Sequence, residues 1–253
     1  MKRYIACMLV MLAGAAWSAT YYVNNQHAQA NDTNPGTATS PLKTIGAAAN
    51  KVGPGDMVIV KAGTYNETVI TRAAGEAGKM ITFKADPRRQ AKAQRFMMTK
   101  AYTRVEGFEL NNPGFGTGIN IIADNVEAVD NYIYNMWTGI SVGMYKSNCY
   151  VARNRIYHCH AGMGVSSNNC LIEDNEIERL FDYGQGDCDY SRFFGENITF
   201  RGNHFHGTNF NEIGSAHVDC WQTFDNNGEQ AVNVIMDRNI CADCHQGIMG
   251  ESH

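Results

Sequence analysis

The segment from His217 to Gln222 reads His-Val-Asp-Cys-Trp-Gln, so that a proton-transfer side chain, a carboxylate, an aromatic ring and an amide occur within six positions. Alternate side chains of a β-strand point to opposite faces, and the register decides which of these groups meet. One register places His217, Asp219 and Trp221 on the outer face, as an acid/base pair beside a ring on which a sugar could stack. The other register turns Trp221 to the core and Gln222 outward. In a third interpretation, His217 and Asp219 only satisfy each other within a polar coil.

The loop from Asp182 to Tyr190 gathers three carboxylates among glycines, those of Asp182, Asp187 and Asp189. Acidic side chains in such loops coordinate Ca²⁺ through oxygen atoms, so the sequence predicts a calcium site here, with Asp219 as a further ligand from the next coil. Simple solvation of an acidic loop is the alternative. Asp219 with Asp187 or Asp189 also suits a glycoside hydrolase, because carboxylates about 5 Å apart repel each other and raise the pKa of one of them.

Both groups fall within the longest insertions of a repeated frame. The frame holds an apolar residue, two variable positions, Asn, one variable position and a second apolar residue. Its complete or partial copies are centred on residues 108, 131, 154, 175, 203 and 239, in steps of 23, 23, 21, 28 and 36 residues. Extra residues in a repeat protein form loops on one side, where functional residues cluster. From the longer insertion we assign catalysis to Asp219 and His217, and substrate binding to Trp221, Gln222 and Glu212.

A period of this length with short alternating apolar stretches predicts a β-solenoid. Equivalent residues of neighbouring coils then stack about 4.8 Å apart. Asn tolerates the left-handed backbone conformation of a sharp bend, and its amide can bond the coils above and below, which explains the ladder of Asn131, Asn154, Asn175, Asn203 and Asn239. A second column is expected to point inward and holds Val126, Cys149, Cys170, Ile198 and Val234. A further strand in each coil follows Gly118, Gly139 and Gly162.

The first 18 residues have the features of a secretory signal peptide: an early basic pair, a short apolar run and small residues at Ala16 and Ser18. We therefore expect residues 1–18 to be removed and the protein to be secreted or periplasmic. The apolar run is too short for a permanent membrane span.

The remaining chain divides into two parts. Residues 19–86 are predicted to form an N-terminal cap and the first coils, with a capping helix from Pro41 to Val52 and Ser40 as its N-cap. This helix is expected to cover the exposed strand edge of the first coil. Residues 87–253 are predicted to form the β-helix coils, and because the sequence stops in mid-coil, further coils are expected beyond position 253.

Composition excludes several classes of partner. The formal net charge is −4, and from position 100 onward the lysines are Lys100 and Lys146, so there is no basic stripe for nucleic acid. No later segment is apolar enough for a membrane, and we expect a monomer without nucleic-acid or membrane partners.

Eight cysteines occur in the chain, and one of them lies within the predicted signal peptide, so the mature protein would contain an odd number. Cys149 and Cys170 share a phase and come within disulfide reach if the coils stack, although the role of small buried filler is favoured. Cys241-x-x-Cys244 has the spacing of half a zinc site, but no second pair follows and zinc is disfavoured.

Five short motifs of residues 21–65 resemble the N-terminal cap of secreted right-handed parallel β-helix proteins. They are Tyr21-Tyr22-Val23, Asn34-Pro35-Gly36-Thr37, Pro41-Leu42-Lys43-Thr44-Ile45, Pro54-Gly55-Asp56 and Gly63-Thr64-Tyr65. Relatives of this kind include polysaccharide lyases of the pectate lyase and chondroitinase B type. The resemblance implies an all-β fold, a single right-handed parallel β-helix that covers nearly the whole mature chain.

For a lyase of this kind, the resemblance implies that Ca²⁺ neutralises a uronate carboxylate while a Lys or Arg removes the neighbouring proton. No Lys follows Lys146, so Arg192, Arg201 and Arg238 are the substitutes that we consider, with Arg201 and Arg238 placed in the catalytic set. We therefore expect an extracellular enzyme that cleaves an acidic polysaccharide by β-elimination. A glycoside hydrolase and a non-catalytic carbohydrate-binding or surface protein are the alternatives, because this fold carries all three.

Overall fold

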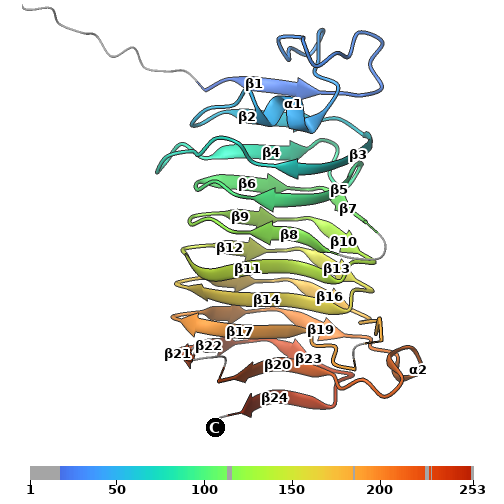
Figure 1. Ribbon diagram of the computed structural model, residues 1–253, viewed down its shortest axis with the longest axis vertical. Helices are drawn as coiled ribbons and strands as arrows, with labels where there is room; N and C mark the ends of the chain where they lie inside the picture. Colours follow the sequence, from blue (N-terminus) through green and yellow to red (C-terminus); the bar gives the residue numbers. More distant parts are fainter. Residues whose placement is uncertain (1–17, 113–115, 185, 226–227, 229, 252–253) are drawn as a thin grey trace, which may run out of the picture.

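The computed structural model describes residues 18–251, apart from 113–115, 185, 226–227 and 229. Successive coils stack along the long axis, from the N-terminal cap at the top of Figure 1 to the last described strand at the bottom. The fold is the predicted all-β, right-handed parallel β-helix. The predicted signal peptide lies outside the described residues except for Ser18. No helix among the described residues is long and apolar enough to cross a membrane.

Three walls of parallel strands run the length of the solenoid. The first wall consists of β1 (Thr20–Val23), β2 (Met57–Val60), β4 (Ile81–Ala85), β6 (Thr103–Glu106), β9 (Glu127–Val129), β12 (Tyr150–Ala152), β15 (Leu171–Glu173), β18 (Thr199–Arg201) and β22 (Ile235–Asp237). The second wall consists of β7 (Glu109–Leu110), β10 (Tyr132–Tyr134), β13 (Arg155–Tyr157), β16 (Glu176–Glu178), β19 (His204–His206) and β23 (Ile240–Cys241).

The third wall carries the candidate site. It consists of β8 (Thr117–Ile121), β11 (Thr138–Ser147), β14 (Ala161–Asn168), β17 (Ser191–Glu196), β20 (Asp219–Phe224) and β24 (Gln246–Glu251). Near the N-terminus, β3 (Gly63–Ile70) pairs with β5 (Ala91–Met98), which in turn pairs with strands of the second and third walls; β21 (Ala231–Val232) pairs with β17.

The repeated frame read from the sequence defines two columns of the core, and both are confirmed. The first column of stacked residues is Val105, Ala128, Val151, Ile172, Phe200 and Met236. The second is Leu110, Ile133, Ile156, Ile177, Phe205 and Cys241. Most of these side chains have no exposed surface. Met236 and Cys241 are partly exposed, because no further coil lies beneath them in the described part of the chain.

The Asn ladder is a continuous chain of buried hydrogen bonds. The backbone N–H and the side-chain amide of Asn154 both donate to Oδ1 of Asn175, each at 3.0 Å. Asn175 makes the same pair of bonds to Asn203. The second amide hydrogen of each residue bonds a backbone carbonyl, as from Asn175 to Val151 at 2.9 Å. A buried polar column is tolerated here because its donors and acceptors are paired.

The left-handed residue at this bend was wrongly placed in the sequence interpretation. The positive φ angles belong to the residues one position earlier, namely Gly107, Asp130, Arg153, Asp174, Gly202 and Arg238. The physical reason is that two successive residues have different roles at the bend. The first adopts the left-handed conformation that turns the backbone, and the second points its side-chain amide into the stack. Asn is therefore selected at the ladder for its hydrogen bonds and not for its backbone.

The N-terminal cap also differs from the prediction. The helix α1 runs only from Ile45 to Ala49, and its N-cap is Thr44, whose Oγ1 accepts from the Ala47 N–H at 3.1 Å. It cannot begin at Pro41, because Leu42 pairs with Val23 in a parallel β-bridge and its carbonyl accepts from the Asn24 N–H at 2.9 Å instead of from a helical N–H. The segment from 36 to 42 thereby covers the edge of β1, and α1 contributes Ile45 and its alanines to the core.

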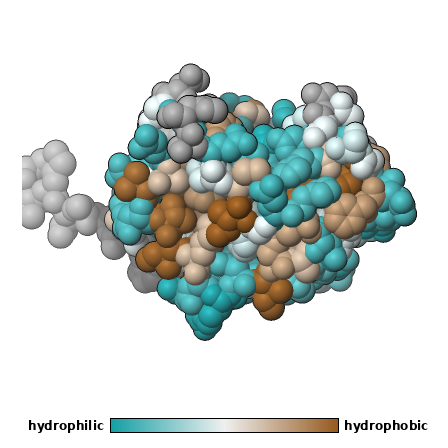
Figure 2. Space-filling model, turned by 90° about the horizontal axis from the view of Figure 1, so that it is seen from below, coloured by the Kyte–Doolittle hydropathy of each residue, from teal (hydrophilic) through white to brown (hydrophobic). Residues whose placement is uncertain are grey.

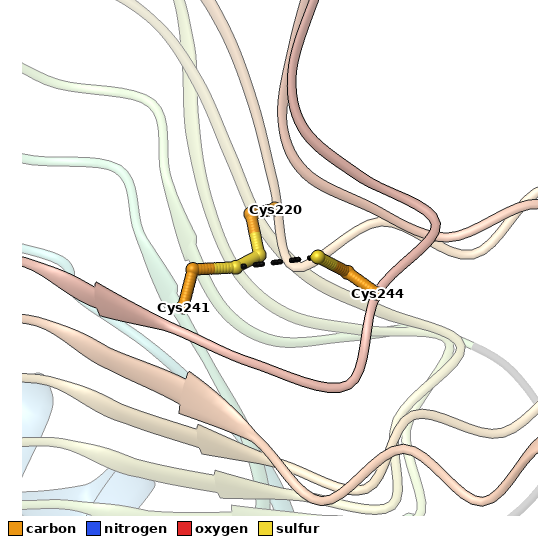
Figure 3. A group of neighbouring side chains, drawn as sticks. All are labelled: Cys220, Cys241 and Cys244. Atoms are coloured by element: carbon orange, nitrogen blue, oxygen red, sulfur yellow. Dashed lines mark hydrogen bonds between the residues drawn. A yellow bond between two sulfur atoms is a disulfide. The ribbon is translucent and has the colours of Figure 1, made fainter.

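Two cysteine arrangements distinguish the middle of the solenoid from its end. Cys149 and Cys170 stack as free, buried thiols, which confirms the filler interpretation. In the last coils, Cys220 of β20 and Cys241 of β23 form a disulfide, and Sγ of Cys244 lies 3.7 Å from Sγ of Cys241. Figure 3 shows these three side chains converging from neighbouring coils.

Figure 2 looks onto the end of the solenoid opposite the cap and shows apolar side chains among polar ones. Ile235, Ile240 and Ile248 are 52%, 59% and 60% exposed there. These residues belong to the last strands of the three walls. Ile235 and Ile240 lie beneath the outward-facing Thr199 and His204, whereas Ile248 lies beneath the buried Trp221.

Candidate functional site

A cavity of about 410 Å³ opens on the outer side of the third wall. Its lining includes Trp137, His160, Asp187 and Arg192. The rings of Trp137 and His160 lie 4.3 Å apart, and Tyr183 stacks on Trp137 at 6.0 Å between ring centroids. An aromatic wall beside charged groups is a surface on which a sugar ring can stack while its hydroxyls form hydrogen bonds.

The guanidinium of Arg192 organises the acidic side of this cavity. Arg192 lies in β17 directly beneath Gly164 of β14, and the Gly164 position opens onto free space. Its Nε donates to Oδ2 of Asp189 at 2.5 Å, and its Nη2 forms an ion pair with Asp187. Two carboxylates of the predicted calcium set are therefore held by an arginine from the same coil.

Asp189 and Asp219 form a buried layer behind Arg192. The Asp219 N–H donates to Oδ1 of Asp189 at 3.0 Å, and both side chains are at most 1% exposed. Burial raises the pKa of Asp189 to about 6, although the Arg192 charge opposes this shift. Burial also raises the pKa of Asp219, and His217 acts in the opposite direction. Neither oxygen of Asp219 has a hydrogen-bond partner among the described residues.

His217 faces this buried carboxylate. Its Nδ1 lies 3.3 Å from Oδ1 of Asp219, and its side chain is 40% exposed. The ring stacks on His245 at 5.1 Å, and His217 pairs in register with Asp187, which lines the cavity one coil earlier. When Nδ1 of a histidine faces a carboxylate, Nε2 serves as the proton-transfer atom and the carboxylate stabilises the charged ring. The two groups form an ion pair without a hydrogen bond, so the buried carboxylate can stabilise a protonated His217 by its charge.

Four of the sequence-predicted residues therefore meet at one place: His217, Asp219, Asp187 and Asp189. The carboxylate of Asp182 faces a different partner, because its Oδ1 lies 3.5 Å from Nδ1 of His160.

The structure places Arg201 and Arg238, both assigned to catalysis from the sequence, on a different wall from Asp219. Arg201 lies in β18 on the first wall, where Nε donates to Asp237 at 3.2 Å. Arg238 follows β22 on the same wall and is also paired with Asp237, with its side chain 73% exposed. Asp219 begins β20 on the third wall, so neither guanidinium shares its surface. Arg201 and Arg238 lie within the copies of the repeated frame centred on residues 203 and 239, so the sequence pattern already indicated their wall.

The substrate-binding assignments are likewise corrected. Trp221 is 6% exposed and packs on Phe205 at 4.9 Å between ring centroids, so it is a core residue and not a stacking platform. The strand follows the register in which Gln222 faces out, but Gln222 is only 9% exposed. Glu212 lies in the short helix α2 (Phe210–Ile213) and bonds Arg179 of the preceding coil at 2.9 Å.

Sequence reasoning missed Trp137 and His160 and left Arg192 outside its catalytic set. Trp137 and His160 are 23 residues apart, which is one coil, and each lies two residues before a glycine of the third wall. This shared phase is the signal that could have identified the aromatic column, because equivalent positions on neighbouring coils stack.

The predicted calcium ligands do not converge in this structure. Ca²⁺ needs six to eight oxygen ligands at about 2.3–2.6 Å. Arg192 occupies the space between Asp187 and Asp189, while Asp182 faces a histidine nitrogen. The described arrangement does not fit the ion, so no catalytic step is assigned to it, and calcium binding stays a prediction.

Comparison with known proteins agrees with this fold. Residues 99–230 match the family described as the right handed beta helix region, and residues 28–77 match a family described as "Protein of unknown function (DUF1565)". The first match covers more than half of the chain, so the chain belongs to the right-handed β-helix family. Among curated proteins, the uncharacterized protein YwoF of Bacillus subtilis (strain 168) is 39% identical over 54 residues, which are 21% of this chain and 12% of YwoF.

Solved structures with the same fold include several that act on carbohydrates. A rhamnogalacturonan lyase aligns with a TM-score of 0.63 at 15% identity, over 93% of this chain and 66% of that chain. Pectate lyase Pel9A gives 0.53 at 15% identity, over 88% of this chain and 78% of that chain. The alginate lyase from Paenibacillus sp. str. FPU-7 gives 0.53 at 14% identity, over 91% of this chain and 99% of that chain. This chain spans slightly less than two thirds of the rhamnogalacturonan lyase. At these identities the likeness shows the fold alone.

Proposed function

We propose that this protein cleaves an acidic polysaccharide by β-elimination, with its substrate bound in the cavity beside Trp137 and Arg192. The observation that carries the proposal is the His217–Asp219 pair, a half-exposed imidazole whose Nδ1 faces a fully buried carboxylate. The lyases among the structural neighbours support the substrate class, as polysaccharide-active proteins on the same scaffold.

Each step of the elimination has a residue beside the cavity. Arginine carries five N–H donors, and Arg192 gives Nε and Nη2 to aspartates, so its other donors can bind a uronate carboxylate. That contact draws electron density from the neighbouring carbon and acidifies its proton. Nε2 of His217 takes this proton, the bond from C4 to the leaving oxygen breaks, and a double bond forms between C4 and C5. The leaving oxygen keeps the electron pair of the broken bond and takes a proton from solvent. Asp219 stabilises the resulting imidazolium.

The test is the absorbance of the unsaturated uronate product while the protein is mixed separately with pectate, alginate and chondroitin sulfate. Absorbance growth that is lost in His217→Gln and retained in His245→Gln supports elimination with His217 as base. His245 is the matched control, because it stacks on His217 but its Nδ1 accepts the Val218 N–H at 3.0 Å. Equal activity of both variants would remove His217 from the mechanism.

Hydrolysis is the second candidate, and a separate observation favours it. Asp187 and Asp189 bind one guanidinium, and burial holds the pKa of Asp189 at about 6. A carboxyl that keeps its proton near neutral pH can act as a general acid beside an ionised partner. New reducing ends without absorbance would establish hydrolysis, and neither signal on any substrate would favour a carbohydrate-binding protein.

The proposal includes secretion or periplasmic location, for which the first 18 residues provide the support. We expect N-terminal sequencing of the protein from a periplasmic or culture fraction to begin near Ala19. An intact Met1 on a cytoplasmic product would contradict it.

A further inference from the structure

A second group of chemically reactive side chains adjoins the cavity behind Trp137. Nδ1 of His160 lies 3.3 Å from Sγ of Cys188 and 3.5 Å from Oδ1 of Asp182. One ligand atom from each of the three lies within 4.8 Å of the others. Cys188 has no exposed surface, and His160 is 5% exposed. The proposed elimination uses none of these residues for proton transfer, although the ring of His160 lines the cavity beside Trp137.

The fold brings this group together from two coils. His160 directly precedes β14, whereas Asp182 and Cys188 stand at the two ends of the glycine-containing loop of the next coil. The N–H of Gly184 donates to Oδ1 of Asp182 at 2.8 Å, and the Cys188 N–H donates to the His217 carbonyl at 2.8 Å. These hydrogen bonds fix Asp182 and Cys188 in place. The side chains of both residues then point at the same nitrogen, Nδ1 of His160.

The imidazole nitrogen at the centre of this group is surrounded by donors and acceptors. The Tyr183 N–H points at Nδ1 of His160 at 3.5 Å, in addition to the contacts with Cys188 and Asp182. The 2.8 Å bond from the Gly184 N–H holds Oδ1 of Asp182 in place beside the imidazole. Nitrogen, sulfur and oxygen atoms are thus assembled at one largely buried place, and this is a ligand set that thiophilic cations take.

We propose that His160, Asp182 and Cys188 bind a thiophilic divalent cation, Zn²⁺. Nitrogen, thiolate and carboxylate ligands bind zinc at about 2.0–2.3 Å, and tetrahedral geometry then separates neighbouring ligand atoms by about 3.3–3.6 Å. The two observed separations agree with this spacing. Sulfur and imidazole ligands favour zinc over Ca²⁺, which takes oxygen. The Cys188 thiol loses its proton to solvent when the ion binds, and a fourth ligand such as water completes the tetrahedron.

Two other groups of possible metal ligands occur in the described part of the chain. Glu176, His204 and His206 offer no thiolate, so an ion bound there cannot give the sulfur-dependent absorption used below. The other group is that of Cys220, Cys241 and Cys244. Its Cys220–Cys241 disulfide withdraws two of the three sulfurs from metal binding while it stays oxidised. Measurements without reductant therefore favour the His160 site, and Cys244→Ser supplies a matched loss of one thiol elsewhere.

The test is a titration of the whole chain with Co²⁺, which replaces Zn²⁺ and gives a near-ultraviolet absorption when bound by a thiolate. We expect this absorption in the native protein and in Cys244→Ser, its removal by added Zn²⁺, and its loss in Cys188→Ser. His160→Gln should weaken Co²⁺ binding about a hundredfold or more. Zn²⁺ should raise the Tm of the native protein and not that of Cys188→Ser.

Absence of the absorption in native protein, or its survival in Cys188→Ser, would overturn the proposal. Loss in Cys244→Ser with retention in Cys188→Ser would move the metal to the three-cysteine group and equally refute it. If circular dichroism shows that Cys188→Ser does not fold, Asp182→Asn replaces it. Asn has nearly the same volume as Asp, and the side chain at this position is partly exposed. The proposal is independent of the lyase activity, since the readout is metal binding and His217 is unchanged.

Discussion

The Asn ladder and the carboxylate cluster are two polar groups in the interior of one solenoid, and they are built in opposite ways. Along the ladder, the Asn side chains of successive coils bond one another and the backbone. Around the cluster, the buried polar atoms without a hydrogen-bond partner among the described residues include both oxygens of Asp219, Oδ1 of Asp187, Oγ of Ser191 and Oε1 of Gln222. Satisfied networks stabilise a fold, whereas unsatisfied buried charge marks groups kept for binding or catalysis.

The largest effect is expected at the cluster. Asp219→Asn removes the charge that orients His217 and keeps the shape, so turnover on the identified substrate should fall about a hundredfold or more. Stability should not fall, because a buried carboxylate without hydrogen-bond partners is replaced by a neutral amide. Kinetics and urea melts on one variant measure both quantities. A destabilised but fully active Asp219→Asn would make the pair structural and move the site to Asp187 and Asp189.

A substitution in the Asn ladder should lower the stability of the fold, in contrast to Asp219→Asn. Asn175→Ala removes two donated and two accepted hydrogen bonds from a buried column, so the free energy of unfolding should fall by about 2 to 4 kcal/mol. The exposed Asn66 provides the same substitution without burial, and Asn66→Ala should change stability by less than about 0.5 kcal/mol. Similar losses in the two variants would show that the ladder adds nothing beyond local backbone preference.

A smaller, pH-dependent effect is expected from Asp189. Burial raises its folded-state pKa to about 6, above its ordinary value of 3.8, so between these values the folded protein holds a proton that the unfolded chain releases. The stabilising contribution is therefore complete below about pH 4 and is lost as the pH rises through 6, by at most about 1.4 kcal/mol per pH unit. Urea melts across this range should show Asp189→Asn gaining stability relative to the native protein as pH rises. A constant difference would mean that Arg192 keeps Asp189 ionised throughout.

The smallest effect concerns calcium. Arg192 holds Asp187 and Asp189, so Ca²⁺ must displace it in the native protein. We expect Ca²⁺ to raise the Tm of Arg192→Gln more than that of the native protein, because the substitution frees two carboxylates. Calorimetric melts with Ca²⁺ and with EDTA measure the shift. A larger shift in the native protein would show that the ion binds without displacing the guanidinium.

The coil period, the two core columns and the Asn ladder could all be predicted from the sequence. They depend on spacing, because stacking repeats the same environment every 21 to 36 residues and selects the same residue type at each copy. For Asn175 and Ile177, and likewise for Ile119 and Ile121, the neighbouring sequence is enough to show which position of the coil each residue occupies.

The site was decided by tertiary structure. Insertions interrupt the period, and after an insertion the pattern no longer indicates on which of three walls a residue lies. For this reason the pattern did not show that Arg192 meets Asp187 and Asp189, or that Trp221 enters the core. Trp137 and His160 gained their neighbours only when the loop of the following coil closed beside them. The spacing of the repeats predicts the residues that occupy equivalent positions in every coil. The contacts of residues outside the repeats depend on the path that the chain takes between one repeat and the next.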